Sequence, residues 1–236
     1  MSHPLLAQLR SADAAERAAA CRAVASDPAG ALLAEPVVAA LGDPDKRVAR
    51  AANETLVALA RSGSGDGVVK LLRRALRGDP APLRVQAAFV LARLEPPEPS
   101  LLPALVEGMA APEGDLRWSA ARVLVDMGRL HGEIVRVLLG LVHDAKAGAR
   151  RMAVFCLREL APDSGAAALA LVDASRDADA AVRRAAITAM AGLLAPPQDV
   201  LERLGEAARE ADPIAAELAR LALARLGGAT NSEEAR

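Results

Sequence analysis

Aromatic residues are nearly absent from this chain of 236 residues. They make up 1% of it, as one tryptophan and two phenylalanines, and there is no tyrosine. The hydrophobic fraction of 53% is therefore carried by aliphatic side chains, largely alanine and leucine. Such a composition predicts a thin core that is held by many small contacts between closely approaching helices.

Net charge is also nearly absent. The 29 basic and 30 acidic residues leave a formal net charge of −1. A nucleic-acid-binding domain normally carries a strong basic excess. We therefore expect no dedicated nucleic-acid binder, although a local basic stripe would be compatible with this balance.

Long apolar runs are missing as well, although the mean hydropathy of +0.20 is positive. No stretch approaches the roughly 18 uncharged apolar residues that a membrane-spanning helix needs, so we expect no membrane association. The first residues, Met1 to Pro4, lack a basic segment followed by an apolar run, which argues against a secretory signal. We expect a cytoplasmic protein.

A repeat of about 33 residues is the strongest feature that is present. Anchor positions lie 35, 33, 33, 33 and 33 residues apart, at Val48, Leu83, Leu116, Ala149, Val182 and Ala215. Alanine follows each anchor by four residues, at Ala52, Ala87, Ala120, Ala153, Ala186 and Ala219. Leucine or methionine follows by eight and by eleven residues. These offsets trace one face of a helix, so one amphipathic helix recurs at a fixed spacing, which is typical of a solenoid.

A second, shorter apolar segment precedes each anchor helix, and we call the two segments of a repeat helix A and helix B. The predicted A helices are Glu35–Leu41, Val68–Leu76, Leu101–Met109, Ile134–Val142, Ala166–Val172 and Val200–Ala208. Several B helices are predicted to begin at an aspartate, because aspartate can accept hydrogen bonds from the first free N–H groups. These aspartates are Asp43, Asp79 and Asp212, each followed by proline, and Asp144 and Asp177 at equivalent places. The glycine-rich insertion 61–67 is predicted to be a flexible linker.

These patterns predict an all-α fold, a right-handed α-α superhelix of about seven two-helix repeats. A degenerate first repeat is expected around Leu5, Leu9 and Val24. We expect one solenoid over residues 1–227 without an internal domain break, followed by a flexible tail at 228–236.

The motif Asp-x-x-x-x-Val-Arg-x-x-Ala, seen at 177–186, resembles the bacterial HEAT-like repeats, the short type named after phycobilisome lyases. The resemblance covers nearly the whole chain, and the unit is shorter than the roughly 40–47 residues of longer HEAT and armadillo repeats. It implies a stacked helical solenoid whose B helices line a concave surface. The resemblance to a lyase family rests on the repeat type, and no residue supports bilin chemistry.

No catalytic or metal-binding constellation is recognisable. HEAT-like deoxyhypusine hydroxylase binds two irons through His-Glu dipeptides, but none of His3, His131 and His143 is followed by glutamate. The two cysteines, Cys21 and Cys156, lie four repeats apart and are predicted to be buried and reduced. We therefore expect no catalytic residue, no metal and no cofactor.

One residue after the anchor stands a row of arginines in four consecutive repeats, Arg84, Arg117, Arg150 and Arg183. We interpret it as a structural ladder in which each guanidinium binds aspartates or loop carbonyls of its own or the next repeat. Capture of phosphate or carboxylate ligands is the alternative interpretation.

The aromatic residues are predicted to lie on the outward side of helix B, two or six residues after an anchor. Aromatic and arginine side chains dominate binding hot spots, so we expect a concave binding patch there. Its predicted members are Trp118, Phe89, Phe155, Arg122, Arg151, Arg158 and Arg184. The phenylalanines could instead fill gaps between repeats.

The chain is therefore predicted to be a non-catalytic scaffold that binds an acidic or amphipathic segment of a partner protein on this surface. Two alternatives stay open. One is an accessory factor, of the lyase or chaperone kind, for a cofactor-bearing or pigment-bearing protein, and the other is weak binding of nucleic-acid phosphates through the arginine rows. The sequence does not indicate the oligomeric state.

Overall fold

Short helices packed in pairs make up the computed structural model, which describes residues 3–233, with side chains described through residue 227. Residues 3–233 contain helices and no β-strand. The all-α fold class is thus confirmed. The chain divides into two compact units, Met1–Gly108 and Met109–Arg236.

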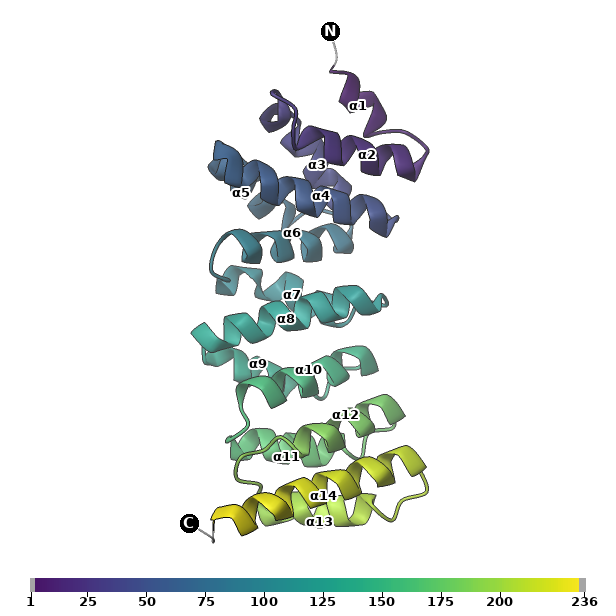
Figure 1. Ribbon diagram of the computed structural model, residues 1–236, viewed down its shortest axis with the longest axis vertical. Coiled ribbons are helices and arrows are strands. Elements are labelled where there is room, and N and C mark those ends of the chain that lie inside the picture. The colour runs from purple at the N-terminus through teal and green to yellow at the C-terminus, as the bar shows by residue number, and fades with distance from the viewer. Residues whose placement is uncertain (1–2, 234–236) are drawn as a thin grey trace. The chain divides into compact units, whose positions relative to one another are not determined.

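The first unit contains the helices from α1 to most of α7, including short 3-10 and π segments. In chain order these are α1 (Pro4–Gln8), α2 (Ala14–Val24), η1 (Gly30–Leu33), α3 (Ala34–Ala39), η2 (Ala40–Gly42), α4 (Lys46–Leu59), η3 (Ala60–Ser64), α5 (Gly65–Ala75), α6 (Ala81–Leu94), η4 (Pro99–Leu101) and α7 (Leu102–Met109). Helix α2 packs on α4, and α4 on α6, so the B helices of this unit lie one above the next (Figure 1).

The second unit also consists of paired helices. They are α8 (Gly114–Leu130), α9 (Glu133–Leu141), α10 (Ala147–Leu160), α11 (Gly165–Ala174), α12 (Ala180–Met190), α13 (Gln198–Ala207) and α14 (Pro213–Glu233). The B helices α8, α10, α12 and α14 pack in that order, and the A helices α9, α11 and α13 form a second layer beside them (Figure 1).

The repeated apolar columns form the contact between neighbouring B helices. All six anchors and all six of the following alanines are buried. The columns at eight and eleven residues after the anchor are also buried, apart from Leu223, Leu94 and Leu160, which are half-buried. A methyl group at the alanine position lets two helix backbones come close, which agrees with the thin aliphatic core predicted from composition.

Helix positions predicted from the pattern are confirmed to within a few residues. The predicted A helices coincide with α3, α5, α7, α9, α11 and α13, and the degenerate first repeat corresponds to α1 and α2. The single uninterrupted solenoid over 1–227 stays a prediction, as does the flexible tail at 228–236. Helix α14 runs to Glu233, and residues 234–236 lie outside the described part of the chain.

The predicted role of the aspartates at the starts of the B helices is wrong at α4, α6, α10 and α12. It is right at α14, where Asp212 accepts two of the first N–H groups. Helix α12 is capped by Asp179, not by Asp177, and Asp177 Oδ1 instead accepts the backbone N–H of Asp179 at 2.7 Å. The same arrangement occurs before α4, where Asp45 is the cap and Asp43 accepts the N–H of Asp45 at 2.9 Å. An aspartate two residues before the cap forms a local turn and keeps its second oxygen available for another donor.

No described helix is both long enough and apolar enough to cross a membrane.

Two glycines, one in each unit, provide a test of the described packing. A Cβ added at Gly30, in the first unit, would lie 2.5 Å from the backbone oxygen of Val24, whereas a Cβ added at Gly140 on α9 would meet nothing within 4 Å. We expect Gly30→Ala to lower the free energy of unfolding by about 1–3 kcal/mol, because the clash is with backbone that cannot rotate away.

Gly140→Ala is the matched control. We expect it to raise the free energy of unfolding by up to about 1 kcal/mol, because alanine has the higher helix propensity. Urea unfolding followed by circular dichroism measures both variants, and a neutral Gly30→Ala would contradict the described packing.

Candidate functional site

A groove on the exposed side of the B helices is the candidate site, and we call it the helix-B groove. It lies in the second unit, has a volume of about 420 Å³ and crosses α8, α10 and α12. The polar and aromatic side chains that line it are Trp118, Arg151, Phe155, Arg158, Arg184 and Thr188. The repeat explains this grouping: Trp118, Arg151 and Arg184 all stand two residues after an anchor, so neighbouring helices present them side by side.

An aromatic pair forms one wall of the helix-B groove. The rings of Trp118 and Phe155 meet edge to face, with centroids 4.8 Å apart and an angle of 75° between the planes. The Arg158 guanidinium carbon lies 5.2 Å from the Phe155 ring centroid, a cation–π arrangement. Trp118 keeps 44% of its surface exposed, and Phe155 is half-buried. These contacts fix the orientation of the rings without covering the tryptophan.

Two of the three groove arginines already bind carboxylates. Arg158 Nη2 donates to Glu159 Oε1 at 2.6 Å. Arg184 donates to both oxygens of Asp212, at 3.0 and 3.1 Å, and thereby joins α12 to the start of α14. Among the described residues, no hydrogen bond or ion pair engages the guanidinium of Arg151.

The other two residues of the predicted patch lie elsewhere. Arg122 is exposed on α8 but does not line the helix-B groove. Phe89 is half-buried on α6 of the first unit. The outward direction assigned to the position two after the anchor is wrong in that repeat, because Val85 is 2% exposed.

Three small or polar lining residues on α12 were missed by the sequence analysis. Ala185, Thr188 and Ala189 form the opposite wall, and the Thr188 hydroxyl donates to Arg184 O at 2.8 Å. The repeat does locate Thr188, which stands in the same column as Phe155, but a small side chain gives no indication of a binding role in the sequence.

Two of the four ladder arginines, Arg84 and Arg150, join one repeat to the next through paired hydrogen bonds to a carboxylate. Arg150 donates to both oxygens of Asp177, at 2.6 and 2.7 Å, and its third nitrogen donates to the carbonyls of Asp144 and Ala145 in its own turn. In the first unit, Arg84 binds Glu107 in the same bidentate way, at 2.8 and 2.6 Å, and Arg17 binds Asp43. Planar bidentate contacts of this kind are the geometry that suits arginine.

Arg117 and Arg183 depart from this geometry. Arg117 donates to the carbonyls of Ala111 and Pro112, both at 2.7 Å, but its buried Nε has no hydrogen-bond partner among the described residues. Arg183 binds its own turn and lies 3.8 Å from Asp212, whose two oxygens bind Arg184 instead. On α12, the arginine that binds the carboxylate of the next repeat is therefore Arg184, one residue after the ladder position.

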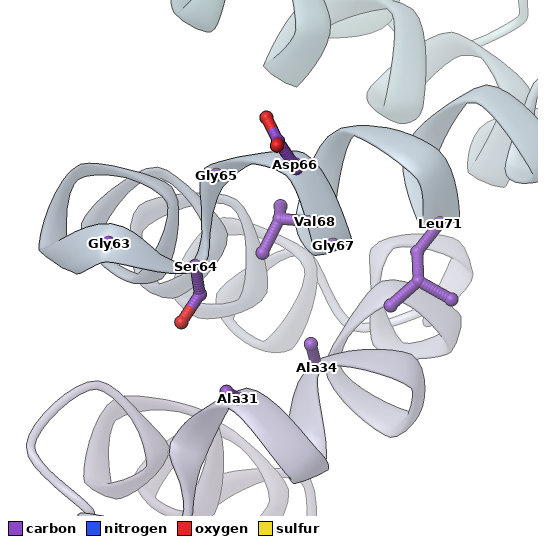
Figure 2. A pocket seen from close by; sticks show the side chains of 9 residues that line it. All are labelled: Ala31, Ala34, Gly63, Ser64, Gly65, Asp66, Gly67, Val68 and Leu71. Atoms are coloured by element: carbon purple, nitrogen blue, oxygen red, sulfur yellow. The ribbon is translucent and has the colours of Figure 1, made fainter.

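A second hollow, of about 620 Å³, lies in the first unit beside the glycine-rich insertion (Figure 2). The insertion is not an extended loop: it forms the π-helical turn η3, with Gly63 at φ +104°, and then the start of α5. Among the described residues that line the hollow, only Asp66 is charged, and its carboxylate points away from Ala31 and Ala34 in Figure 2. Without a basic group, this hollow lacks the chemistry of a phosphate site.

The two thiols do not have the properties of nucleophiles. Cys21 and Cys156 are both free and fully buried. Burial raises the pKa of the Cys21 thiol to about 11 and that of the Cys156 thiol to about 12. Within the described residues, no group of three or more histidine, cysteine, aspartate or glutamate side chains is placed to hold a metal ion.

Comparisons with known proteins bear on the fold. No protein-family model and no curated protein matches the chain. Among solved structures, Kap95p in its study with RanGDP aligns with a TM-score of 0.60 at 15% identity, over 94% of this chain and 35% of that one. Importin beta aligns with a TM-score of 0.56 at 17% identity, over 82% of this chain and 28% of importin beta. YibA of E. coli aligns with a TM-score of 0.53 at 17% identity, over 94% of this chain and 91% of YibA. The structural neighbours thus include HEAT/ARM-repeat solenoid proteins, and the fold is a helical repeat solenoid.

The contact between Arg150 and Asp177 predicts a pH-dependent contribution to stability. The Arg150 guanidinium lowers the pKa of Asp177 below its usual value. The stabilisation is therefore fully present above the unfolded-state pKa and is lost as the pH falls through the lower folded-state pKa. We expect Asp177→Asn to lower the free energy of unfolding by about 1–2 kcal/mol at neutral pH.

Urea unfolding at several pH values measures this effect. The difference between wild type and Asp177→Asn should shrink once the pH falls below about 4. Asp163→Asn is the control, since Asp163 is exposed and has no hydrogen bond or ion pair among the described residues. A difference that stayed constant down to acid pH would show that the charge of Asp177 does not matter.

The buried thiols predict slow chemical labelling. We expect neither cysteine to react appreciably with a thiol-specific disulfide reagent in the folded protein, because both sulfur atoms are inaccessible and protonated at neutral pH. Both should react at once in urea. Rapid labelling of the folded protein would contradict the described burial.

Proposed function

We propose that this chain is a non-catalytic interaction scaffold that binds a segment of a partner protein in the helix-B groove. The observation that carries the proposal is the Trp118–Phe155 pair. In a chain with 1% aromatic residues, the only tryptophan lies 44% exposed in a groove lined by arginines. Aromatic and arginine side chains are the residues that most often carry binding energy at protein interfaces.

The neighbouring folds support a role in protein binding. Kap95p, with which the chain shares its solenoid fold, binds RanGDP. The hydrogen bonds of Arg17, Arg84 and Arg150 support a structural role for these arginines, because their donors are directed at carboxylates and carbonyls of the protein itself. Such arginines are poorly placed to capture the phosphates of a nucleic acid.

The proposal also assigns the type of repeat and the cellular location. The period of about 33 residues supports placing the repeats with the short, bacterial HEAT-like type. Two buried cysteines that remain reduced are compatible with a cytoplasmic location.

Selection from a displayed peptide library on the immobilised full-length chain tests this function. We expect peptides that bind the wild type to bind Trp118→Ala about tenfold or more weakly, because the variant removes the exposed ring of a hot spot. Binding of labelled synthetic copies is measured by fluorescence polarisation, and circular dichroism checks that the variant is folded.

Leu194→Ala is the matched control, since Leu194 is 75% exposed but does not line the helix-B groove. It should leave peptide binding unchanged. The proposal fails if the library yields no saturable binder, or if the selected peptides bind Trp118→Ala as well as the wild type.

A further inference from the structure

We propose that the helix-B groove selects a peptide segment with one carboxylate side chain close to an aliphatic side chain, and that Arg151 is the residue that reads the carboxylate. This inference rests on the proposed function and specifies the chemistry of its ligand. It follows from the charges around the groove and from the positions of Arg151 and Phe155 on one helix.

The charges around the helix-B groove leave one cation unmatched. Among the described residues that line it, three are arginines and none carries a carboxylate. Glu159 binds Arg158, and Asp212 binds Arg184, so two of the three positive charges are matched by the protein itself. Arg151 is half-buried and has no such partner among the described residues. A ligand carboxylate is the group that completes this set of charges.

The two matched arginines also restrict the ligand. Arg158 lies over the Phe155 ring, and its side-chain carbons pass close to Gly192. Arg184 is held by two hydrogen bonds to Asp212. Redirecting either guanidinium to a ligand would break its hydrogen bonds to Glu159 or to Asp212. One acidic group on the ligand is therefore favoured over a cluster of them.

The spacing along α10 sets the distance between the two features of the ligand. Arg151 and Phe155 are four residues apart on this helix, so they lie on the same face, with Cβ atoms about 5–6 Å apart. A ligand that binds both must carry its carboxylate and its apolar group on neighbouring or nearly neighbouring residues. The exposed ring of Trp118 and the methyl groups of Ala185 and Ala189 extend the apolar part of the site.

The Thr188 hydroxyl adds a limited polar contact. Its hydrogen is directed to Arg184 O, so the oxygen is left as an acceptor. It can accept an N–H of a peptide backbone but cannot donate to a carboxylate. The recognition of the acidic group therefore depends on Arg151.

The chain offers an intrinsic probe for the test. Trp118 is the only tryptophan, and there is no tyrosine, so the fluorescence of the protein reports on the helix-B groove alone. The ligands are acetylated, amidated heptapeptides of glycine and serine with one leucine and one glutamate, separated by zero, one or two residues. A second series replaces the glutamate by its neutral isostere glutamine. None of the peptides contains an aromatic residue.

We expect at least one glutamate peptide to change the Trp118 emission saturably, and its glutamine counterpart to bind about 5–10-fold more weakly, with the difference shrinking as salt is added. Arg151→Gln should remove the preference, giving both peptides the affinity of the glutamine peptide. Arg151→Glu should prefer a peptide with lysine in place of glutamate.

Arg136→Gln is the matched control, because Arg136 is an exposed arginine of the same unit, on α9, with no described partner and no place in the groove. It should keep the preference for glutamate. Circular dichroism establishes that all variants are folded.

Each other outcome overturns the inference. Equal binding of the glutamate and glutamine peptides, or a preference that survives Arg151→Gln, shows that Arg151 does not select a carboxylate but leaves peptide binding by the groove intact. If no peptide of either series binds, the ligand class is wrong, and the library selection decides separately whether the groove binds peptides at all.

Discussion

Contact between neighbouring B helices, at the buried alanine that follows each anchor by four residues, is the constraint on which the rest of the structure depends. The alanine four residues after each anchor is buried in every repeat. Helices that approach this closely leave little room for large rings between them. Trp118 lies on the outward side of its helix, away from these contacts, and 44% of its surface is exposed.

The arginine–carboxylate contacts connect this packing to the local structure of the turns. In the Arg150 repeat, one guanidinium binds the carbonyls of its own turn and the aspartate of the next, while that aspartate also shapes the turn before α12. A single residue pair thus holds two turns and one helix start in register. In the repeat of α12, Arg184 binds Asp212 in place of Arg183. One arginine of the groove thereby takes part in the contact between repeats.

The helix-B groove combines a preformed apolar wall with a nearly balanced set of charges. Trp118 and Phe155 fix each other's orientation, and Glu159 and Asp212 fix two of the three arginines. A ligand then has few side chains to order on binding, which lowers the entropic cost of association. The remaining cation, Arg151, supplies the specificity.

The sequence by itself determined the repeat, the helix positions and the buried columns, because a helix face with a period near 3.6 residues can be recognised from spacing alone. It also placed Trp118, Arg151 and Arg184 in one column. Only the tertiary structure decided which arginines bind a carboxylate of the protein. The carboxylates of Asp177 and Asp212 come from the following repeat, and their direction depends on how two repeats pack. It likewise separated Asp43 and Asp177 from the caps two residues later, since both positions are aspartate and only the hydrogen bonds distinguish them.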